Sequence, residues 1–305
     1  MENNYWVSSS PHITNKKVTS KNIYLLMLIS LVPAFIYSII AYGFRAVLIY
    51  FISALATVGT DIVYNLIKNR KFEFKDFSSI YVSVLIAMAM PINVSIMYVV
   101  VACIVTNLFI KNCMGGIGCN FVSEVAVAKA LVFIMMGSLV LNYYSTDGAV
   151  NTVLDSLNAG IKPEGWFGLF AGSGVGAIGE SSALCILIGG VALCVLKVID
   201  YKIPLAYIAS TFIFSAIFMG FGLAPYYILS GGVFFCAFYV ASDFATAPKT
   251  LLGKILCPSI MGLLTVLIWK FGNYHLGAYY AMMICQIATF ALKGFYVPKY
   301  IGEKK

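Results

Sequence analysis

The stretch NIYLLMLISLVPAFIYSIIAY, residues 22–42, contains no charged side chain. A helix needs about 20 mainly apolar residues to cross a bilayer, and this stretch is long enough to do so. A second apolar run, AVLIYFISALATVGTDIVYNLI at residues 46–67, follows almost at once. Such runs recur along the 305 residues, of which 61% are hydrophobic and 10% are charged, whereas ordinary globular chains carry about 25% charge. The mean hydropathy of +0.92 agrees with this pattern. The sequence therefore predicts a membrane protein, and the first run is expected to stay in the mature chain.

Apolar runs of this kind predict ten transmembrane helices. Their ranges are 22–42, 46–67, 78–92, 95–111, 124–141, 181–198, 203–221, 226–243, 253–270 and 277–294. Ten spans divide into two sets of five, and an odd number per set inserts the second half upside down, as in inverted-repeat transporters. The expected fold is an all-α polytopic membrane protein with about ten transmembrane helices in two inverted five-helix repeats.

This fold implies a simple domain organisation. A cytoplasmic segment, 1–21, precedes a single membrane domain, 22–294, and a cytoplasmic tail, 295–305, follows it. The repeat halves cover about 22–141 and 181–294, and an extracytoplasmic loop, 142–180, joins them.

Basic residues predict the orientation, because Lys and Arg accumulate in cytoplasmic loops. Most of the 20 basic residues, Lys111 among them, fall on the side of the N-terminus. The opposite side holds Arg45, Lys162 and Lys270, while Lys129 lies inside the fifth span. Both termini are therefore expected in the cytoplasm, with the chain in a bacterial inner membrane. The net charge of +8 is then a topology signal facing anionic lipid, and it implies no nucleic-acid partner.

Few ionisable residues fall inside the predicted spans. The candidates for an ion pathway are Asp61, Glu124, Lys129 and Asp243, and Glu180 lies at the mouth of the sixth span. A charge near the bilayer centre costs roughly 3 kcal/mol, so Lys129 needs a partner, for which Glu124 is the nearest candidate. Asp61 and Asp243 lie toward helix ends, where reaching water is an equal alternative to a function in transport.

Glycine and proline interrupt the apolar pattern at several places. The third span ends at Pro91, residues 115–120 precede the fifth, and residues 230–232 interrupt the eighth. A glycine-rich run at 168–182 leads into the sixth span. Irregular backbone at membrane depth can line a central site, and a helix N-terminus favours a phosphate. Close helix packing through glycine is the alternative.

Eight cysteines lie mostly within apolar runs, which argues against a disulfide framework or a zinc site.

Five motifs occur in order along the chain. They are Ser9-Ser10-Pro11-His12, Asp76-Phe77-Ser78-Ser79 followed by LIAMAMP at 85–91, GGIGCN at 115–120, LSGG at 229–232 and ASDFATAP at 241–248. Together they resemble the D subunit of the Rnf complex, a membrane ferredoxin:NAD+ oxidoreductase, which is related to the B subunit of the sodium-pumping NADH:quinone reductase. The resemblance runs over nearly the whole chain.

The resemblance implies a component of a redox-driven ion translocase that is not active alone and carries one FMN, joined through its phosphate to a threonine hydroxyl. The stretch DGAVNTVLD at 147–155 is similar to the family's attachment motif with one residue missing, so Thr152 is the expected acceptor and Thr146 the alternative. The residues expected to border the flavin are Gly172, Gly174, Gly176, Ser181 and Ser182. A second, noncovalent flavin between helices is left open.

The same resemblance implies partners. These are the other Rnf subunits (A, B, C, E and G), membrane lipid, and Na+ or H+ as the translocated ion. Two functions without a flavin remain as alternatives: a solute channel or transporter on the same inverted-repeat fold, and a passive assembly scaffold. Composition and topology do not separate these functions, whereas flavin fluorescence retained after denaturation does.

Overall fold

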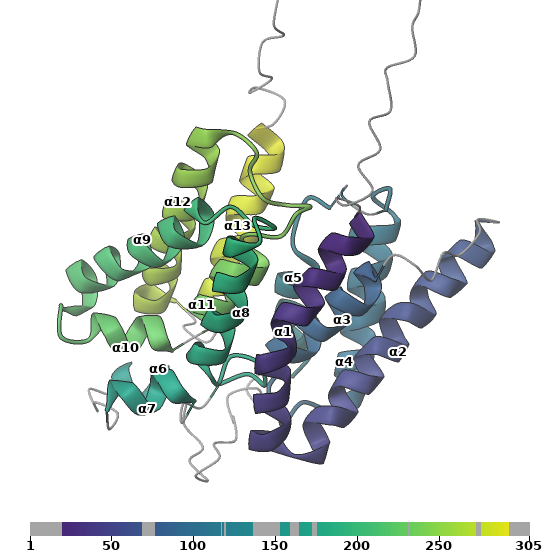
Figure 1. Ribbon diagram of the computed structural model, residues 1–305, viewed down its shortest axis with the longest axis horizontal. Helices are drawn as coiled ribbons and strands as arrows, with labels where there is room; N and C mark the ends of the chain where they lie inside the picture. The colour runs from purple at the N-terminus through teal and green to yellow at the C-terminus, as the bar shows by residue number, and fades with distance from the viewer. Residues whose placement is uncertain are drawn as a thin grey trace, which may run out of the picture.

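The computed structural model describes residues 20–68, 77–116, 118, 120–136, 153–158, 165–172, 176–230, 232–272 and 276–292. The regular secondary structure in these ranges is helical throughout (Figure 1). The helices are α1 (Ser20–Tyr42), α2 (Phe44–Ile67), α3 (Ser78–Ala89), α4 (Ile96–Thr106), the π-helical turn η2 (Asn107–Asn112), α5 (Glu124–Met136), α6 (Val153–Asn158), α7 (Trp166–Ala171), α8 (Ala183–Val195), α9 (Lys202–Met219), α10 (Ala224–Leu229), α11 (Val233–Phe235), the π-helical turn η4 (Cys236–Val240), α12 (Leu251–Phe271) and α13 (Gly277–Leu292).

Each predicted span overlaps at least one of these helices. Among the described residues, α1, α2, α9 and α12 are long and apolar enough to cross a bilayer. The helices α3, α8 and α13, and α4 continued by η2, are apolar but shorter. The prediction of an all-helical membrane protein is therefore confirmed, although several of its helices are shorter than the predicted spans.

Two predicted spans are broken where the sequence contains Gly or Pro. The third ends at Ala89 because Met90 is extended, as the residue before a proline prefers to be, and Pro91 has no amide hydrogen to donate. The eighth, predicted at 226–243, divides into α10, α11 and η4. Ser230 is extended there, and Gly232 has a φ of 70°, which favours glycine.

Most helices pack on others of the same half, whereas α1 and α8 pack mainly on each other. In the first half α2 contacts α3 and α4, and α4 contacts α5. In the second half α9 contacts α10 and α12, and α12 contacts α13. The halves meet where α1 packs on α8 and where α5 packs on α13.

Two adjacent glycines let α8 approach its neighbours closely. A methyl group at Gly189 would overlap the carbonyl oxygen of Ser30 on α1 and the hydroxyl of Tyr239 in η4. A methyl group at Gly190 would overlap the ring of Phe238. Small residues at helix crossings are the usual way in which membrane helices reach such contact, so these two glycines serve packing.

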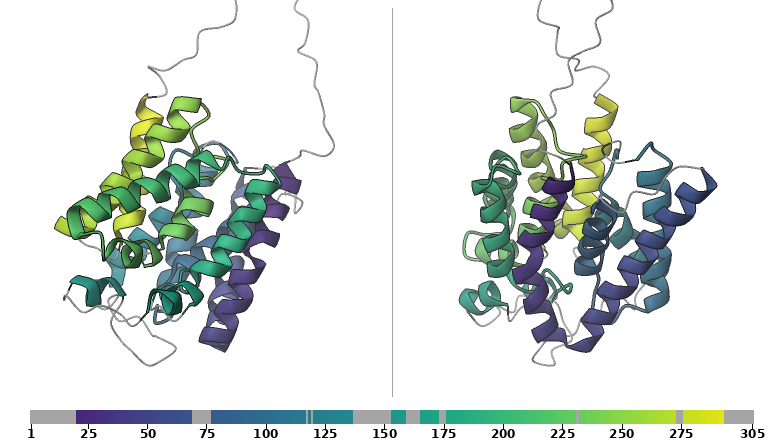
Figure 2. Two further views of the ribbon diagram at one scale, coloured as in Figure 1. Left: turned by 60° about the vertical axis from the view of Figure 1, so that its left-hand side comes forward. Right: turned by 45° about the vertical axis from the view of Figure 1, so that its right-hand side comes forward.

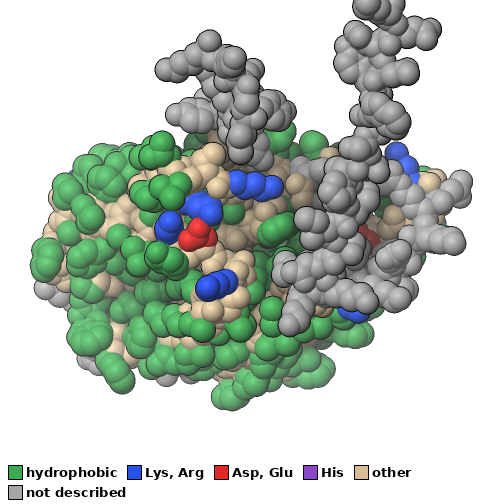
Figure 3. All heavy atoms as spheres, turned by 45° about the horizontal axis from the view of Figure 1, so that its top comes forward, with side chains coloured by type: hydrophobic (Ala, Val, Ile, Leu, Met, Phe, Trp, Pro, Cys, Tyr) green, Lys and Arg blue, Asp and Glu red, His purple; other side chains and the backbone are tan. Residues whose placement is uncertain are grey.

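The two ends of the bundle differ. α1 begins and α13 ends at the same end, while the loop helices α6 and α7 lie at the opposite end (Figures 1 and 2). Lys and Arg side chains gather on the face at which α1 begins, and apolar side chains cover the flanks (Figure 3). Lys254 near the start of α12 has its Nζ 2.8 Å from Oδ2 of Asp200, which lies between α8 and α9, and this hydrogen bond holds the pKa of Asp200 below its usual range.

Candidate functional site

Asp61 on α2 is the centre of a buried polar network. Its Oδ1 accepts hydrogen bonds from Asn107 Nδ2 at 2.9 Å and from Asn112 Nδ2 at 2.8 Å. Its Oδ2 accepts hydrogen bonds from Lys111 Nζ at 2.8 Å and from the hydroxyl of Ser79. Both carboxylate oxygens are thus fully occupied by protein donors.

The π-helical turn η2 supplies three of these donors. A π-helix widens the turn to an i to i+5 hydrogen bond, as between the Leu108 carbonyl and the Cys113 amide at 2.9 Å, and such turns are frequent at functional sites. The wider turn lets residues 107, 111 and 112 all face α2. An ordinary α-helix would place residue 112 further round the axis.

One interpretation of the sequence is corrected here. Asp61 is buried, so the alternative in which it reaches water is wrong. Its partner Lys111, which was counted on the cytoplasmic side, is 7% exposed at its side chain and forms an ion pair with Asp61. Because the surroundings are apolar, each charge needs the other to offset the free-energy cost of its burial.

Lys129 on α5 is the centre of a second buried ion pair. Its Nζ lies 2.6 Å from Glu180 Oε1, with side chains only 5% and 6% exposed. The hydroxyl of Tyr279 on α13 donates to the same oxygen, and the ammonium lies 4.0 Å from the centroid of the Tyr279 ring. The expected pairing of Lys129 with Glu124 is therefore wrong. Glu124 instead accepts a hydrogen bond from Asn120, which lies four residues earlier, just before α5.

Glu180 is held in place by backbone from both halves. A Cβ at Gly232 would lie 2.5 Å from Glu180 Cδ, so the break in the eighth span leaves room for this carboxylate. The turn before Glu180 also closes the end of α3, because the Ile178 and Gly179 amides donate to the carbonyls of Met90 and Met88 at 3.0 and 2.8 Å. The carbonyl groups released by the proline break are thus satisfied inside the protein, as membrane depth requires.

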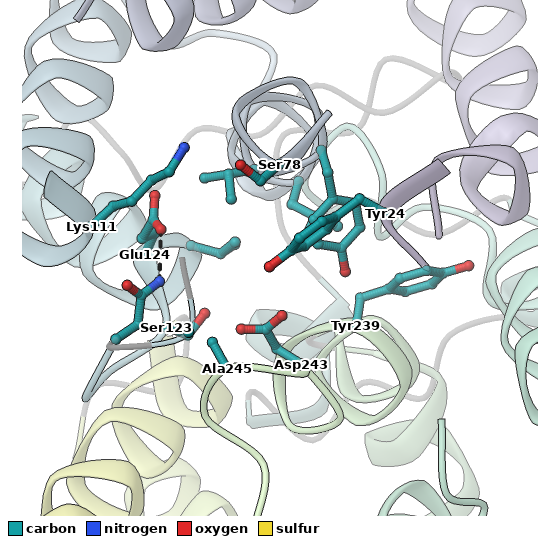
Figure 4. A pocket seen from close by; sticks show the side chains of 14 residues that line it. Tyr24, Ser78, Lys111, Ser123, Glu124, Tyr239, Asp243 and Ala245 are labelled. Atoms are coloured by element: carbon teal, nitrogen blue, oxygen red, sulfur yellow. Dashed lines mark hydrogen bonds between the residues drawn. The ribbon is translucent and has the colours of Figure 1, made fainter. Parts of the chain in front are cut away.

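A narrow pocket opens beside the Asp61 network (Figure 4). The side chains of Tyr24, Ser78, Lys111, Glu124 and Asp243 line it, and they come from α1, α3, η2, α5 and the segment after η4. Tyr24 is near the start of α1 and Ser78 begins α3. The pocket therefore lies toward the end of the bundle at which α1 begins.

Three buried polar atoms at this pocket have no hydrogen-bond partner among the described residues. They are Glu124 Oε2, Asn120 Oδ1 and the Tyr81 hydroxyl oxygen. The Glu124 and Tyr81 residues are only 4% and 1% exposed. A buried polar atom without a partner costs about 1–3 kcal/mol, so a water molecule or an ion bound at this pocket would stabilise the protein.

The residues expected to attach or border a flavin are only partly described. Thr152 and Gly174 lie outside the described residues. Gly172 ends α7 with a φ of 127°, and its carbonyl accepts a hydrogen bond of 2.8 Å from the Tyr37 hydroxyl. Gly176, Ser181 and Ser182 lie in the turn that leads into α8.

The two serines have local roles in this structure. Ser182 is the N-cap of α8, accepts from the Cys185 amide at 3.4 Å and donates to the Ala171 carbonyl at 3.1 Å. Ser181 donates to the Ile178 carbonyl at 3.4 Å. These bonds connect the end of α7 to the start of α8 and shape the turn that was expected to face the cofactor.

Sequence reasoning missed several residues that complete these sites. They are Ser79, Tyr81, Asn107, Asn112, Asn120 and Tyr279. One signal was present in the sequence: Asn107 and Lys111 are polar residues four apart at the end of an apolar run, a spacing typical of one helix face. Asn112 joins that face only because the turn is π-helical.

Comparison with known proteins gives a consistent result. The family model described as the NQR2, RnfD, RnfE family matches residues 6–302. The chain is 32% identical over 314 residues to the D subunit of the Na(+)-translocating ferredoxin:NAD(+) oxidoreductase complex of Acetobacterium woodii, and the match covers 100% of this chain and 97% of the relative. It is 25% identical to the D subunit of the proton-translocating ferredoxin:NAD(+) oxidoreductase complex of Clostridium ljungdahlii, over 100% of this chain and 98% of the relative. It is 28% identical to the D subunit of the ion-translocating oxidoreductase complex of Methanosarcina acetivorans, over 98% and 97% of the two chains.

Proposed function

This chain belongs to the NQR2, RnfD, RnfE family, and we propose that it is the membrane-embedded D subunit of an ion-translocating ferredoxin:NAD+ oxidoreductase complex. The observation that carries the proposal is similarity over the full length to relatives that bear this name, one of them 32% identical. Its partners are the other components of that complex, A, B, C, E and G, which supply the sites for ferredoxin and NAD+. The chain has no activity alone.

We infer further that the chain carries one FMN, esterified through its phosphate to Thr152. Thr152 directly precedes α6, whose Val153, Leu154 and Leu157 are buried in the core. α6 lies at the end of the bundle that also holds α7 (Figure 1). The phosphoester needs an accessible hydroxyl, and Gly172, Gly176, Ser181 and Ser182 would form the nearby backbone. Bound there, FMN supplies electron transfer, while the residues of this chain position it.

The covalent flavin has a direct test. Mass spectrometry of the peptide spanning residues 142–162, taken from the assembled complex, is expected to show an adduct of FMN size on Thr152. Thr152→Ala should lose the adduct completely because the nucleophilic oxygen is gone, while Thr146→Ala, a threonine in the same loop, should keep it. An adduct on Thr146 would move the site, and an unmodified peptide would favour a transporter without a cofactor.

We also propose that the two halves are an inverted repeat. The contacts of α2 with α3 and α4, and of α4 with α5, have counterparts in those of α9 with α10 and α12, and of α12 with α13. The third and eighth predicted spans, each the third of its half, are also both interrupted, at Pro91 and at Ser230 to Gly232. Matching packing of corresponding helices supports an origin from one five-helix unit.

The proposed orientation places both termini in the cytoplasm. The end of the bundle where α1 begins carries the Lys and Arg side chains of Figure 3, and cytoplasmic surfaces are enriched in these residues. Reporter fusions after Lys71 and after Lys249 are therefore expected to read as cytoplasmic, and a fusion near Lys162 as external. A cytoplasmic signal at Lys162 would contradict both this topology and the external flavin.

The proposed path for Na+ or H+ includes some of the four charged residues predicted from the sequence. Asp61 and Lys129 are held in closed ion pairs, with Lys111 and Glu180 respectively. Glu124 and Asp243 instead line the pocket. We therefore assign the pocket-lining carboxylates to the path itself, and the two ion pairs to the walls that surround it.

A further inference from the structure

We propose that Lys129, Glu180 and Tyr279 form a latch that closes the seam between α5 and α13 and opens during ion translocation. The latch is a conformational device: its residues bind no ion themselves, and they control whether the two halves separate along this seam. The proposal deepens the proposed function, on which it rests for the existence of a transport cycle. The latch itself rests on the position, charge and packing of the three side chains.

The first argument is the position of these side chains at the boundary between the halves. Lys129 belongs to α5 of the first half, Tyr279 belongs to α13 of the second half, and Glu180 lies in the turn that leads into α8. The Lys129 ammonium lies 2.6 Å from Glu180 Oε1 and 4.0 Å from the centroid of the Tyr279 ring. Both interactions of Lys129 cross the seam, so the halves separate there only if both interactions break.

A second polar contact joins the same seam at the level of the pocket. The Ser123 amide, just before α5, donates to Gln286 Oε1 on α13 at 2.8 Å, and Gln286 Nε2 donates to the Thr246 hydroxyl at 3.1 Å. Tyr279 and Gln286 are about two helical turns apart, so they lie on one face of α13. The seam is thus joined by polar groups at two levels, and polar groups exchange a protein partner for water at little net cost when a contact opens.

The other contact between the halves is built differently. α1 and α8 approach closely at Gly189, where a methyl group would lie 2.1 Å from the carbonyl oxygen of Ser30. The ion pairs found among the described residues do not link α1 to α8. Close packing of this kind leaves no space for water and resists separation. We therefore expect α1 and α8 to stay together as the pivot while the seam between α5 and α13 opens.

The second argument is the free energy of a buried ion pair. Taking Lys129 and Glu180 out of water costs several kcal/mol per ion, and their mutual attraction does little more than offset this cost. The closed state, with the charges paired, and an open state, with both charges in water, therefore differ little in free energy. Apolar side chains at the same positions would strongly favour the closed state, because opening would expose them to water. An ion pair thus leaves the seam able to open.

The backbone next to the latch is suited to movement. Gly232 has a φ of 70°, and a Cβ there would lie 2.5 Å from Glu180 Cδ. The eighth predicted span is broken at this point, between α10 and α11. Residues at the ends of helices are those that absorb backbone rotation when parts of a protein move. The Glu180 carboxylate therefore occupies the space beside a break that can act as a hinge.

Cys236 in η4 is a natural reporter of the latch. It is 0% exposed, its thiol is within hydrogen-bonding reach of the Tyr279 hydroxyl, and the charges of Glu180 and Lys129 act on it. Opening the latch admits water and small reagents to this thiol.

The test compares the reactivity of this thiol at rest and at work. The purified assembled complex is treated with methyl methanethiosulfonate, with and without electron transfer from reduced ferredoxin to NAD+, and the labelled peptides are quantified by mass spectrometry. Cys236 should react at least about fivefold faster during turnover, because only the open state exposes it. Cys103 on α4 is equally buried inside the first half, and its labelling should not change.

An apolar latch tests the role of the charges. The combination of Lys129→Met, Glu180→Met and Tyr279→Phe keeps the approximate side-chain volumes and removes every polar group of the cluster. The closed state is then favoured, so turnover should fall at least about tenfold and the faster labelling of Cys236 should disappear. The unfolding temperature should equal or exceed that of the parental complex, which separates this result from a loss of the fold.

The matched control removes another ion pair. Lys254→Met combined with Asp200→Asn eliminates a Lys–carboxylate pair of 2.8 Å that lies outside the seam. Turnover and the labelling of Cys236 should both stay at the parental values.

Three results would overturn the proposal. They are equal labelling of Cys236 at rest and during turnover, parental turnover in the apolar variant, and an equal loss of turnover in the control. If the apolar variant does not assemble, the labelling of the parental complex decides alone. Ferredoxin-driven NAD+ reduction and ion uptake by the parental complex are measured first. Their absence refutes the proposed function and the latch with it, whereas their presence without exposure of Cys236 refutes the latch alone.

Discussion

Replacing Lys129 by Met is expected to lower the free energy of unfolding by about 3–5 kcal/mol. The substitution removes the ammonium that lies 2.6 Å from Glu180 Oε1 and leaves a carboxylate that is 6% exposed without its counter-charge. Tyr279 still donates to that carboxylate, but a single neutral donor does not replace a charge in an apolar interior. Equilibrium unfolding in mixed micelles measures the change.

The pair itself need not stabilise the fold, so the double variant is informative. Lys129→Met combined with Glu180→Gln removes both charges and should recover most of the loss, because no unpaired buried charge remains. Lys254→Met is the matched control, since it breaks a Lys–carboxylate pair of the same chemistry at 2.8 Å whose side chains are 27% and 28% exposed. A pair that is in contact with solvent contributes about 0–1 kcal/mol. Equal losses for Lys129→Met and Lys254→Met would contradict the argument.

Replacing Asp61 by Asn should also cost about 3–5 kcal/mol, for a related reason. Donors surround both carboxylate oxygens of Asp61: the Asn107 and Asn112 amides on one side, and Lys111 and Ser79 on the other. Whichever way the new amide turns, its NH2 group faces donors, and Lys111 loses its counter-charge. The free energy of unfolding and the yield of folded protein should both fall.

Asn65→Ala is the control on the same helix. Asn65 lies one turn after Asp61 and, among the described residues, donates to the Asp61 backbone carbonyl at 2.9 Å, so its loss should change the free energy of unfolding by about 0.5 kcal/mol or less. A variant Asp61→Asn within about 1 kcal/mol of the parental protein, by the same measurement, would show that the network is not what stabilises this region.

The helices were largely predictable from the sequence, because each depends on a local run of apolar residues. The ranges predicted for the first and ninth spans differ from α1 and α12 by at most two residues at either end. The breaks at Pro91 and Gly232 were also visible, since proline and glycine act on the backbone where they stand. The loop helices α6 and α7 were not predicted, because six-residue helices are too short to show a hydrophobic period.

The pairing of buried charges was not predictable, and the error over Lys129 shows why. Glu124 was the nearest acid in the sequence, yet Glu180 pairs with Lys129 because the turn before α8 packs against the broken end of α3. A distance of 51 residues along the chain becomes 2.6 Å in space. The pairing of Lys111 with Asp61 was not predicted for the same reason, since a π-helical turn directs Lys111 to Asp61.

The sequence by itself determined that this protein is an all-helical membrane protein of the NQR2, RnfD, RnfE family, because apolar composition and ordered motifs are properties of the chain alone. Only the tertiary structure decided which charges neutralise each other and which oxygen atoms remain without a donor among the described residues. Those outcomes depend on how helices from the two halves approach one another. A buried charge is stabilised by whatever group packing brings within a few ångströms, however far apart the two residues are in the sequence.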